Sequence, residues 1–121
     1  MGMRFEDLKA WQVARQLVSG VYSAVKHADL ARDFGLCDQL QRAAVSVMTN
    51  IAEGFERTGV SEKAQFYNIA RASCSEVRSL LYAVEDTLPA LAERVVELRR
   101  LSHDTGRLIS GLMNSTKQRK I

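Results

Sequence analysis

Four stretches of the sequence repeat apolar residues at helical spacing, and short breaks separate them. With about 3.6 residues per turn, such spacing places the apolar side chains on one side of a helix. Asp7 and Ser61 precede the first and third stretches, and we expect them to be N-caps. No stretch alternates polar and apolar residues as a strand does. The pattern predicts helices over about 7–28, 35–57, 62–87 and 90–113.

The helix lengths and the short breaks between them constrain the architecture. A chain of 121 residues with 46% hydrophobic content suits one domain, 1–121. Four helices of similar length with short connections predict an all-α, antiparallel up-down-up-down four-helix bundle. No apolar run approaches the ~20 residues that a membrane span needs, and the first residues lack the apolar core of a signal peptide. We therefore expect a cytoplasmic protein without a membrane partner.

The net charge of +3 is located at the end of the chain. The last eight residues contain Lys117, Arg119 and Lys120 and no acidic residue, which leaves the rest of the chain neutral overall. We expect the tail at 114–121 to fray, as chain ends commonly do. A basic tail weakly favours phosphate contacts, although most such tails are simply solvated.

The run SVMTNIAEGF at 46–55 lies inside the second predicted helix and contains four weak helix formers, Ser46, Thr49, Asn50 and Gly54. Such a run indicates either a binding site or a close-packed contact. The apolar arc of this helix covers roughly 200°, wider than the ~100° of a simple surface helix, which favours self-association. Solvated stripes favour Lys, Glu and Gln, so we interpret the small polar side chains as a structural or interface motif. The motif comprises Arg42, Ser46, Thr49, Asn50, Glu53, Gly54, Ser73 and Glu76.

The two carboxylates of this motif, Glu53 and Glu76, are interpreted either as members of structural ion pairs or as an acid/base pair. Glu53 and Arg57 stand four residues apart, which predicts an ion pair along the helix. Glu76 falls at the edge of the apolar stripe of the third helix, where a carboxylate needs a partner, and Arg42 is a candidate. The alternative, an acid/base pair of Glu53 and Glu76, is less favoured because structural ion pairs also account for such carboxylates.

The sequence contains no pattern of residues that predicts catalysis. The histidines, His27 and His103, do not follow a Glu by three residues as a di-metal bundle site requires. Cys37 and Cys74 lie on or beside apolar faces, where a small hydrophobic role is commoner than a nucleophilic one. Neither a GxSxG nor a P-loop motif is present. We predict a non-enzymatic protein without metal or cofactor.

One face of the third helix combines arginine with tyrosine, in the line Tyr67, Arg71, Arg78 and Tyr82. Arginine and aromatic side chains bind phosphates and stack on bases. The same residue types are enriched in subunit interfaces, and we favour an interface. The alternative is an RNA- or DNA-binding surface formed by this face with Lys117, Arg119 and Lys120.

Three segments carry a resemblance to a known family: FEDLKAWQVARQLV at 5–18, FGLCDQLQRAAVSVMTNIAEGFER at 34–57 and IARASCSEV at 69–77. They resemble the bacterial four-helix-bundle proteins of the 23S rRNA-intervening-sequence family, over Phe5 to about Met113. The family pattern usually reads Ser-Ile-Pro-Ser-Asn-Ile-Ala-Glu-Gly, and here Val47, Met48 and Thr49 replace its middle. Losing that proline should leave the helix straighter.

The resemblance implies a cytosolic protein that assembles with copies of itself as a homopentamer. It supplies no catalytic residue, and the molecular role of the family is not established. A group similar in fold, the accessory proteins of diversity-generating retroelements, binds a reverse transcriptase and nucleic acid. The partners that we expect are therefore other copies of the chain, with RNA or a nucleic-acid-processing protein as the alternative.

Overall fold

The computed structural model describes residues 2–118, and within them the chain is helical and contains no strand, which confirms the all-α prediction. Four long α-helices account for most of these residues, together with one short α-helix and two 3₁₀ helices. In chain order the elements are η1 (Phe5–Asp7), α1 (Lys9–Ala24), α2 (Ala28–Ala31), α3 (Phe34–Glu56), α4 (Val60–Thr87), η2 (Pro89–Leu91) and α5 (Ala92–Gln118).

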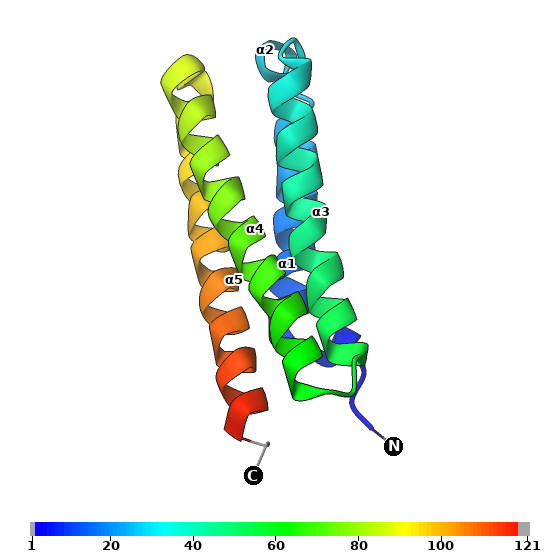
Figure 1. Ribbon diagram of the computed structural model, residues 1–121. Helices are drawn as coiled ribbons and strands as arrows, with labels where there is room; N and C mark the ends of the chain where they lie inside the picture. Colours follow the sequence, from blue (N-terminus) through cyan, green and yellow to red (C-terminus); the bar gives the residue numbers. More distant parts are fainter. Residues whose placement is uncertain (1, 119–121) are drawn as a thin grey trace.

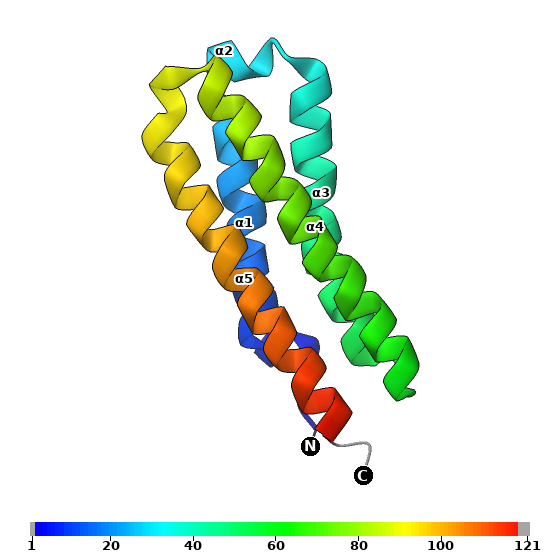
Figure 2. The same cartoon turned by 60° about the vertical axis from the view of Figure 1, so that its left-hand side comes forward.

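The four long helices lie lengthwise beside one another (Figures 1 and 2). Helix α3 packs against α1 and α4, and α5 packs against the same two helices. The α3–α4 connection lies at one end of the molecule, whereas α2 and the α4–α5 connection lie at the other (Figure 1). Each long helix therefore has two neighbours and one outward side.

Two of the predicted helix starts are wrong. Asp7 ends η1 and Leu8 is the N-cap of α1, because the Asp7 carboxylate accepts a hydrogen bond from the Arg4 backbone N–H at 2.9 Å instead. Helix α4 begins directly after Gly59, ahead of Ser61. The start of α3 is capped by a side chain, since Asp33 Oδ1 accepts from the Leu36 N–H at 3.0 Å.

The two ends of the helical region also differ from the sequence prediction. The first helix stops at Ala24, and α2 follows in the segment predicted as a break, where Leu30 is 1% exposed. Helix α5 continues to Gln118, so the tail at 114–118 is helical rather than frayed. Lys117 lies in its last turn, where a cation interacts favourably with the helix dipole. Arg119 and Lys120 lie outside the described residues.

The core consists of two apolar clusters along the molecule. One cluster includes Leu17, Leu40 and Leu81, and the other includes Ile51 and Ile109. The fully buried hydroxyls of Ser102 and Thr105 donate to the carbonyl oxygens of Leu98 and Leu101, at 2.9 and 2.7 Å. These bonds satisfy the polar groups within α5 itself. None of the helices in residues 2–118 combines the length and apolar content needed to cross a membrane.

Candidate interaction surface on helices α3 and α4

Three residues of the predicted motif meet where α3 contacts α4. The hydroxyl oxygens of Ser46 and Ser73 are 2.9 Å apart. Asn50 Nδ2 donates to the Ser46 carbonyl oxygen at 2.8 Å and to the Ser46 hydroxyl at 3.0 Å. Ser73 is 7% exposed and the other two side chains are half-buried. This cluster joins the two helices by polar contacts at a place where small side chains let them approach closely.

Other members of the motif are exposed and lie apart from this cluster. The Thr49 hydroxyl donates to the Val45 carbonyl oxygen of its own helix at 3.0 Å. Arg42 Nε lies 3.2 Å from an Asp38 carboxylate oxygen, with both side chains mostly exposed. Glu76 is exposed and forms no ion pair with any described residue, so the candidate pairing with Arg42 is absent within the chain.

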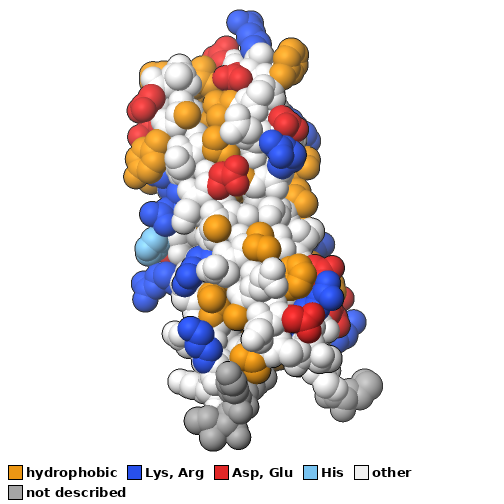
Figure 3. Space-filling view, in the orientation of Figure 1, with side chains coloured by type: hydrophobic (Ala, Val, Ile, Leu, Met, Phe, Trp, Pro, Cys, Tyr) orange, Lys and Arg blue, Asp and Glu red, His pale blue; other side chains and the backbone are white. Residues whose placement is uncertain are grey.

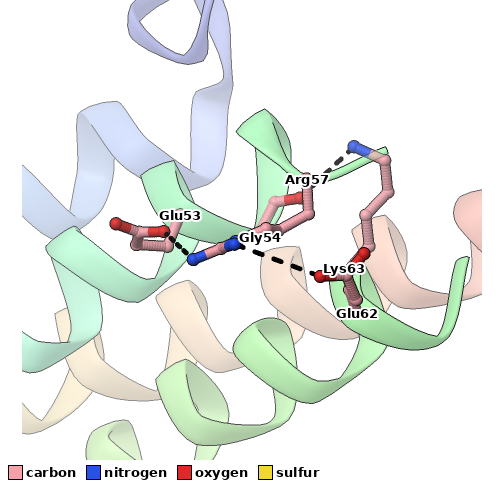
Figure 4. Close-up of polar contacts among 5 residues, drawn as sticks. All are labelled: Glu53, Gly54, Arg57, Glu62 and Lys63. Carbon is pink, nitrogen blue, oxygen red and sulfur yellow. Dashed lines mark hydrogen bonds and ion pairs between the residues drawn. The ribbon is translucent and has the colours of Figure 1, made fainter. Parts of the chain in front are cut away.

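The end of α3 is held by charged side chains (Figure 4). Arg57 donates to Glu53 at 3.0 Å, which confirms the ion pair predicted from their spacing, and it lies 4.0 Å from Glu62. Lys63 Nζ donates to the carbonyl oxygens of Gly54 and Phe55, at 3.2 and 2.7 Å. These are carbonyls that a helix end leaves without a partner. Glu53 therefore belongs to an exposed ion pair rather than to an acid/base pair with Glu76.

Gly54 is buried against the ring of Tyr67 on α4. A Cβ atom at Gly54 would lie 2.6 Å from Tyr67 Cε1 and 2.7 Å from Cδ1. Tyr67 is 2% exposed, so its predicted place on the outer Arg/Tyr face is wrong. The ring instead fills the space that the absent side chain of Gly54 leaves. A glycine inside a long helix was the sequence signal for this contact, but its partner could not be identified.

The rest of the Arg/Tyr face remains exposed on α4. Arg71 donates to Asn68 Oδ1 at 3.0 Å and to the Ser110 hydroxyl of α5 at 3.4 Å. Arg78 is exposed, and Tyr82 is 53% exposed. The guanidinium of Arg99, from α5, lies 4.2 Å from the centre of the Tyr82 ring. The face thus follows the contact between α4 and α5.

A second exposed line of α4, which we call the α4 stripe, was missed by the sequence analysis. It consists of Ile69, Ala72, Glu76, Ser79 and Ala83, all exposed. Their separations alternate between three and four residues, the spacing of helix contacts in coiled coils. Ile69 is apolar and yet 43% exposed. Most charged side chains lie toward the margins of the face shown in Figure 3, and its middle is largely uncharged or hydrophobic.

The wide apolar arc of α3 is only partly available to a second molecule. Met48 and Phe55 pack against the core of their own chain. Val45 and Ala52 remain half-exposed. By contrast, the outward side of α5 presents exposed ionisable residues such as Glu93 and His103, which is typical of a solvated helix. The α4 stripe is therefore the less polar of the two outward helix sides.

Both thiols are in environments that suppress their reactivity. Burial raises the pKa of Cys74 to about 12, and the nearby charge of Arg78 offsets only part of this effect. Burial and then the charge of Asp33 raise the pKa of Cys37, whose Sγ donates to the Leu30 carbonyl oxygen at 3.1 Å. Across residues 2–118, His, Cys, Asp and Glu form no group of three or more that is able to hold a metal ion.

The sequence matches the model of a known protein family. No curated protein matches the chain. The sequence model described as "23S rRNA-intervening sequence protein" matches residues 6–111, a range that includes α1 to α4 and most of α5. This family is not a known enzyme family. The match covers most of the sequence, and the chain belongs to the 23S rRNA-intervening sequence protein family.

Proposed function

We propose that this protein is a non-enzymatic, cytoplasmic, self-assembling helical-bundle protein that acts as an interaction or scaffold protein. Its four long helices form an antiparallel up-down-up-down bundle, and copies of the bundle associate as a homo-oligomer, a homopentamer by the family resemblance. The observation that carries the proposal is the α4 stripe. Only one of its five exposed residues is ionisable, whereas a solvated helix side usually carries several charged residues.

The chemistry of the α4 stripe suits contact with another helix. Ala72, Ser79 and Ala83 have short side chains, so a neighbouring backbone is able to approach closely. Ile69 is 43% exposed and contributes apolar surface that association would remove from water. Glu76 has no ionic partner within the described chain, and a second copy carries the exposed Arg42 that would pair with it.

Ala72→Arg tests this proposal, with Ser75→Arg as a matched control on the same helix. Both positions are exposed, but Ser75 lies outside the α4 stripe. We expect the wild type to sediment as an oligomer at micromolar concentration, Ala72→Arg to sediment as a monomer, and Ser75→Arg to match the wild type. Circular dichroism should show equal helix content in all three. A monomeric wild type, or an Ala72→Arg protein of unchanged mass, would contradict the proposal.

Nucleic-acid binding by the exposed Arg71, Arg78 and Tyr82 with the basic tail is the second candidate. The observation in its favour is that neither arginine forms an ion pair with a described residue. Binding to RNA would then weaken steeply with salt and fall in an Arg71→Ala/Arg78→Ala variant. Salt-independent binding, or full affinity in that variant, would refute it.

A further inference from the structure

A long groove runs between α1 and α5, on a different part of the surface from the α4 stripe. Its larger part has a volume of about 1020 Å³, and a second part of about 610 Å³ continues it. The two parts share Gln16, Arg100 and Leu101, so they form one continuous depression. Figure 2 shows the two helices that form its walls. Gly20 lines the larger part, and α1 approaches Leu98 of α5 closely there.

The groove is lined by more cations than carboxylates. The cations are Lys9, Arg15, Arg94, Arg100 and Arg107, and the carboxylates are Glu6, Glu97 and Asp104. This leaves a formal excess of two positive charges, although the chain without its tail is neutral overall. None of the five cations forms an ion pair with a described residue. Their charge is therefore available to an anionic ligand.

Two of the arginines are held in place by neutral partners. Arg94 donates to the Ser23 hydroxyl across the groove at 2.6 Å. The Arg15 guanidinium lies 5.7 Å from the centre of the Trp11 ring. Trp11 also packs edge-on against Phe5, with ring centres 5.2 Å apart. A cation held by a neutral group keeps its full charge and loses less conformational freedom when it binds an anion.

The length of the groove indicates an extended ligand. At ~1.5 Å of rise per residue, Arg94, Arg100 and Arg107 stand ~9–11 Å apart along α5. Such a row exceeds the reach of a single phosphate or mononucleotide. The bases of a duplex are paired and stacked inside it, whereas the bases of a single strand are free to stack on a protein ring. The half-buried Trp11 at the groove offers such a ring, which favours a single strand as the ligand.

We propose that the α1–α5 groove binds single-stranded nucleic acid, with Arg94, Arg100 and Arg107 contacting successive phosphates and Trp11 contacting a base. Gln12, Gln16 and Ser19 line the same groove and supply uncharged hydrogen-bonding groups. They carry no base-specific pattern, so the affinity is mainly electrostatic and depends on salt.

The test uses the full chain and a short fluorescently labelled poly(U) RNA, with binding followed by anisotropy over a range of salt concentrations. The groove variant is Arg94→Ala/Arg100→Ala/Arg107→Ala, and the matched control is Lys26→Ala/Arg32→Ala, two exposed cations that line neither part of the groove and lie outside the Arg/Tyr face of α4. For a single strand, the logarithm of the affinity falls with the logarithm of the salt concentration, with a slope of about −0.7 for each phosphate contact. Because the groove variant lacks three such contacts, its slope should be shallower by about 2. Its affinity at ~0.1 M salt should be about 100-fold lower than that of the wild type. The control should bind as the wild type does.

A second variant separates lost charge from lost structure. Arg94→Lys/Arg100→Lys/Arg107→Lys keeps the charges and should retain most of the binding, and circular dichroism should show equal helix content in all variants. The proposal is overturned if the wild type fails to bind poly(U) at low salt or if the Ala groove variant keeps its affinity. It is also overturned if the Lys26→Ala/Arg32→Ala control loses binding instead, or if polyglutamate competes as well as unlabelled poly(U), since the groove would then be a site for acidic polypeptides.

Discussion

Replacing Gly54 by alanine tests whether the contact with Tyr67 determines the packing of α3 on α4. Alanine favours a helix over glycine by about 1 kcal/mol, so an unhindered site would gain stability. Here the new Cβ would lie 2.6 Å from a carbon of a ring that is 2% exposed. Forcing extra volume into a packed core typically costs about 1–3 kcal/mol. The free energy of unfolding should therefore not rise, and should fall by up to about 2 kcal/mol.

Urea unfolding followed by far-UV circular dichroism measures this effect, at one protein concentration because assembly links stability to concentration. Gly111→Ala is the matched control, since a Cβ there meets nothing within 4 Å. It should gain up to about 1 kcal/mol. In a Tyr67→Leu background the ring is gone, and Gly54→Ala should become neutral or stabilising. A Gly54→Ala variant that gains as much stability as Gly111→Ala would refute the reasoning, because the ring would then move away at little cost.

Two further outcomes follow from the surface ion pair and the buried thiol. Glu53→Ala should lower the free energy of unfolding by less than ~0.5 kcal/mol, because the side chains of Glu53 and Arg57 are 52% and 43% exposed. A loss above ~1 kcal/mol in urea unfolding would contradict this expectation. Folding raises the pKa of Cys74 from 9.0 to about 12, so its stabilising contribution is complete below pH 9 and is lost as the pH rises toward 12. The stability of the wild type should therefore fall more steeply than that of Cys74→Ala across this range, and parallel profiles would refute the assignment.

The all-α fold and its long helices could be predicted from the sequence, because the buried positions follow the helical period over long segments. Leu40, Val47 and Ile51 recur at that period in α3, and all are at most 1% exposed. The helix starts were less predictable because a cap depends on which polar group reaches the free N–H. Asp7 illustrates this, since its carboxylate accepts from Arg4 and leaves α1 without a side-chain cap.

The errors within α4 have a different cause. Each helix here contacts two others, so its apolar arc is broad and periodicity alone does not show which edge is covered. Ile69 is apolar but exposed, whereas Tyr67 is amphipathic but buried. Tyr67 is buried because Gly54 leaves room for its ring, and Gly54 belongs to another helix. Such a contact depends on the register between α3 and α4, which the sequence pattern does not specify.

The proposed assembly surface and the proposed nucleic-acid groove involve different helix pairs, and this separates their tests. The α4 stripe lies on a helix that packs against α3 and α5, whereas the groove lies between α5 and α1. Ala72→Arg changes no residue of the groove, and the groove variant changes no residue of the stripe. An oligomer formed through α4 would carry one groove in each copy, so a long strand would bind several grooves with higher avidity than a short one. Neither proposal needs the other, because a monomer retains the whole groove and an oligomer forms whether or not RNA is bound.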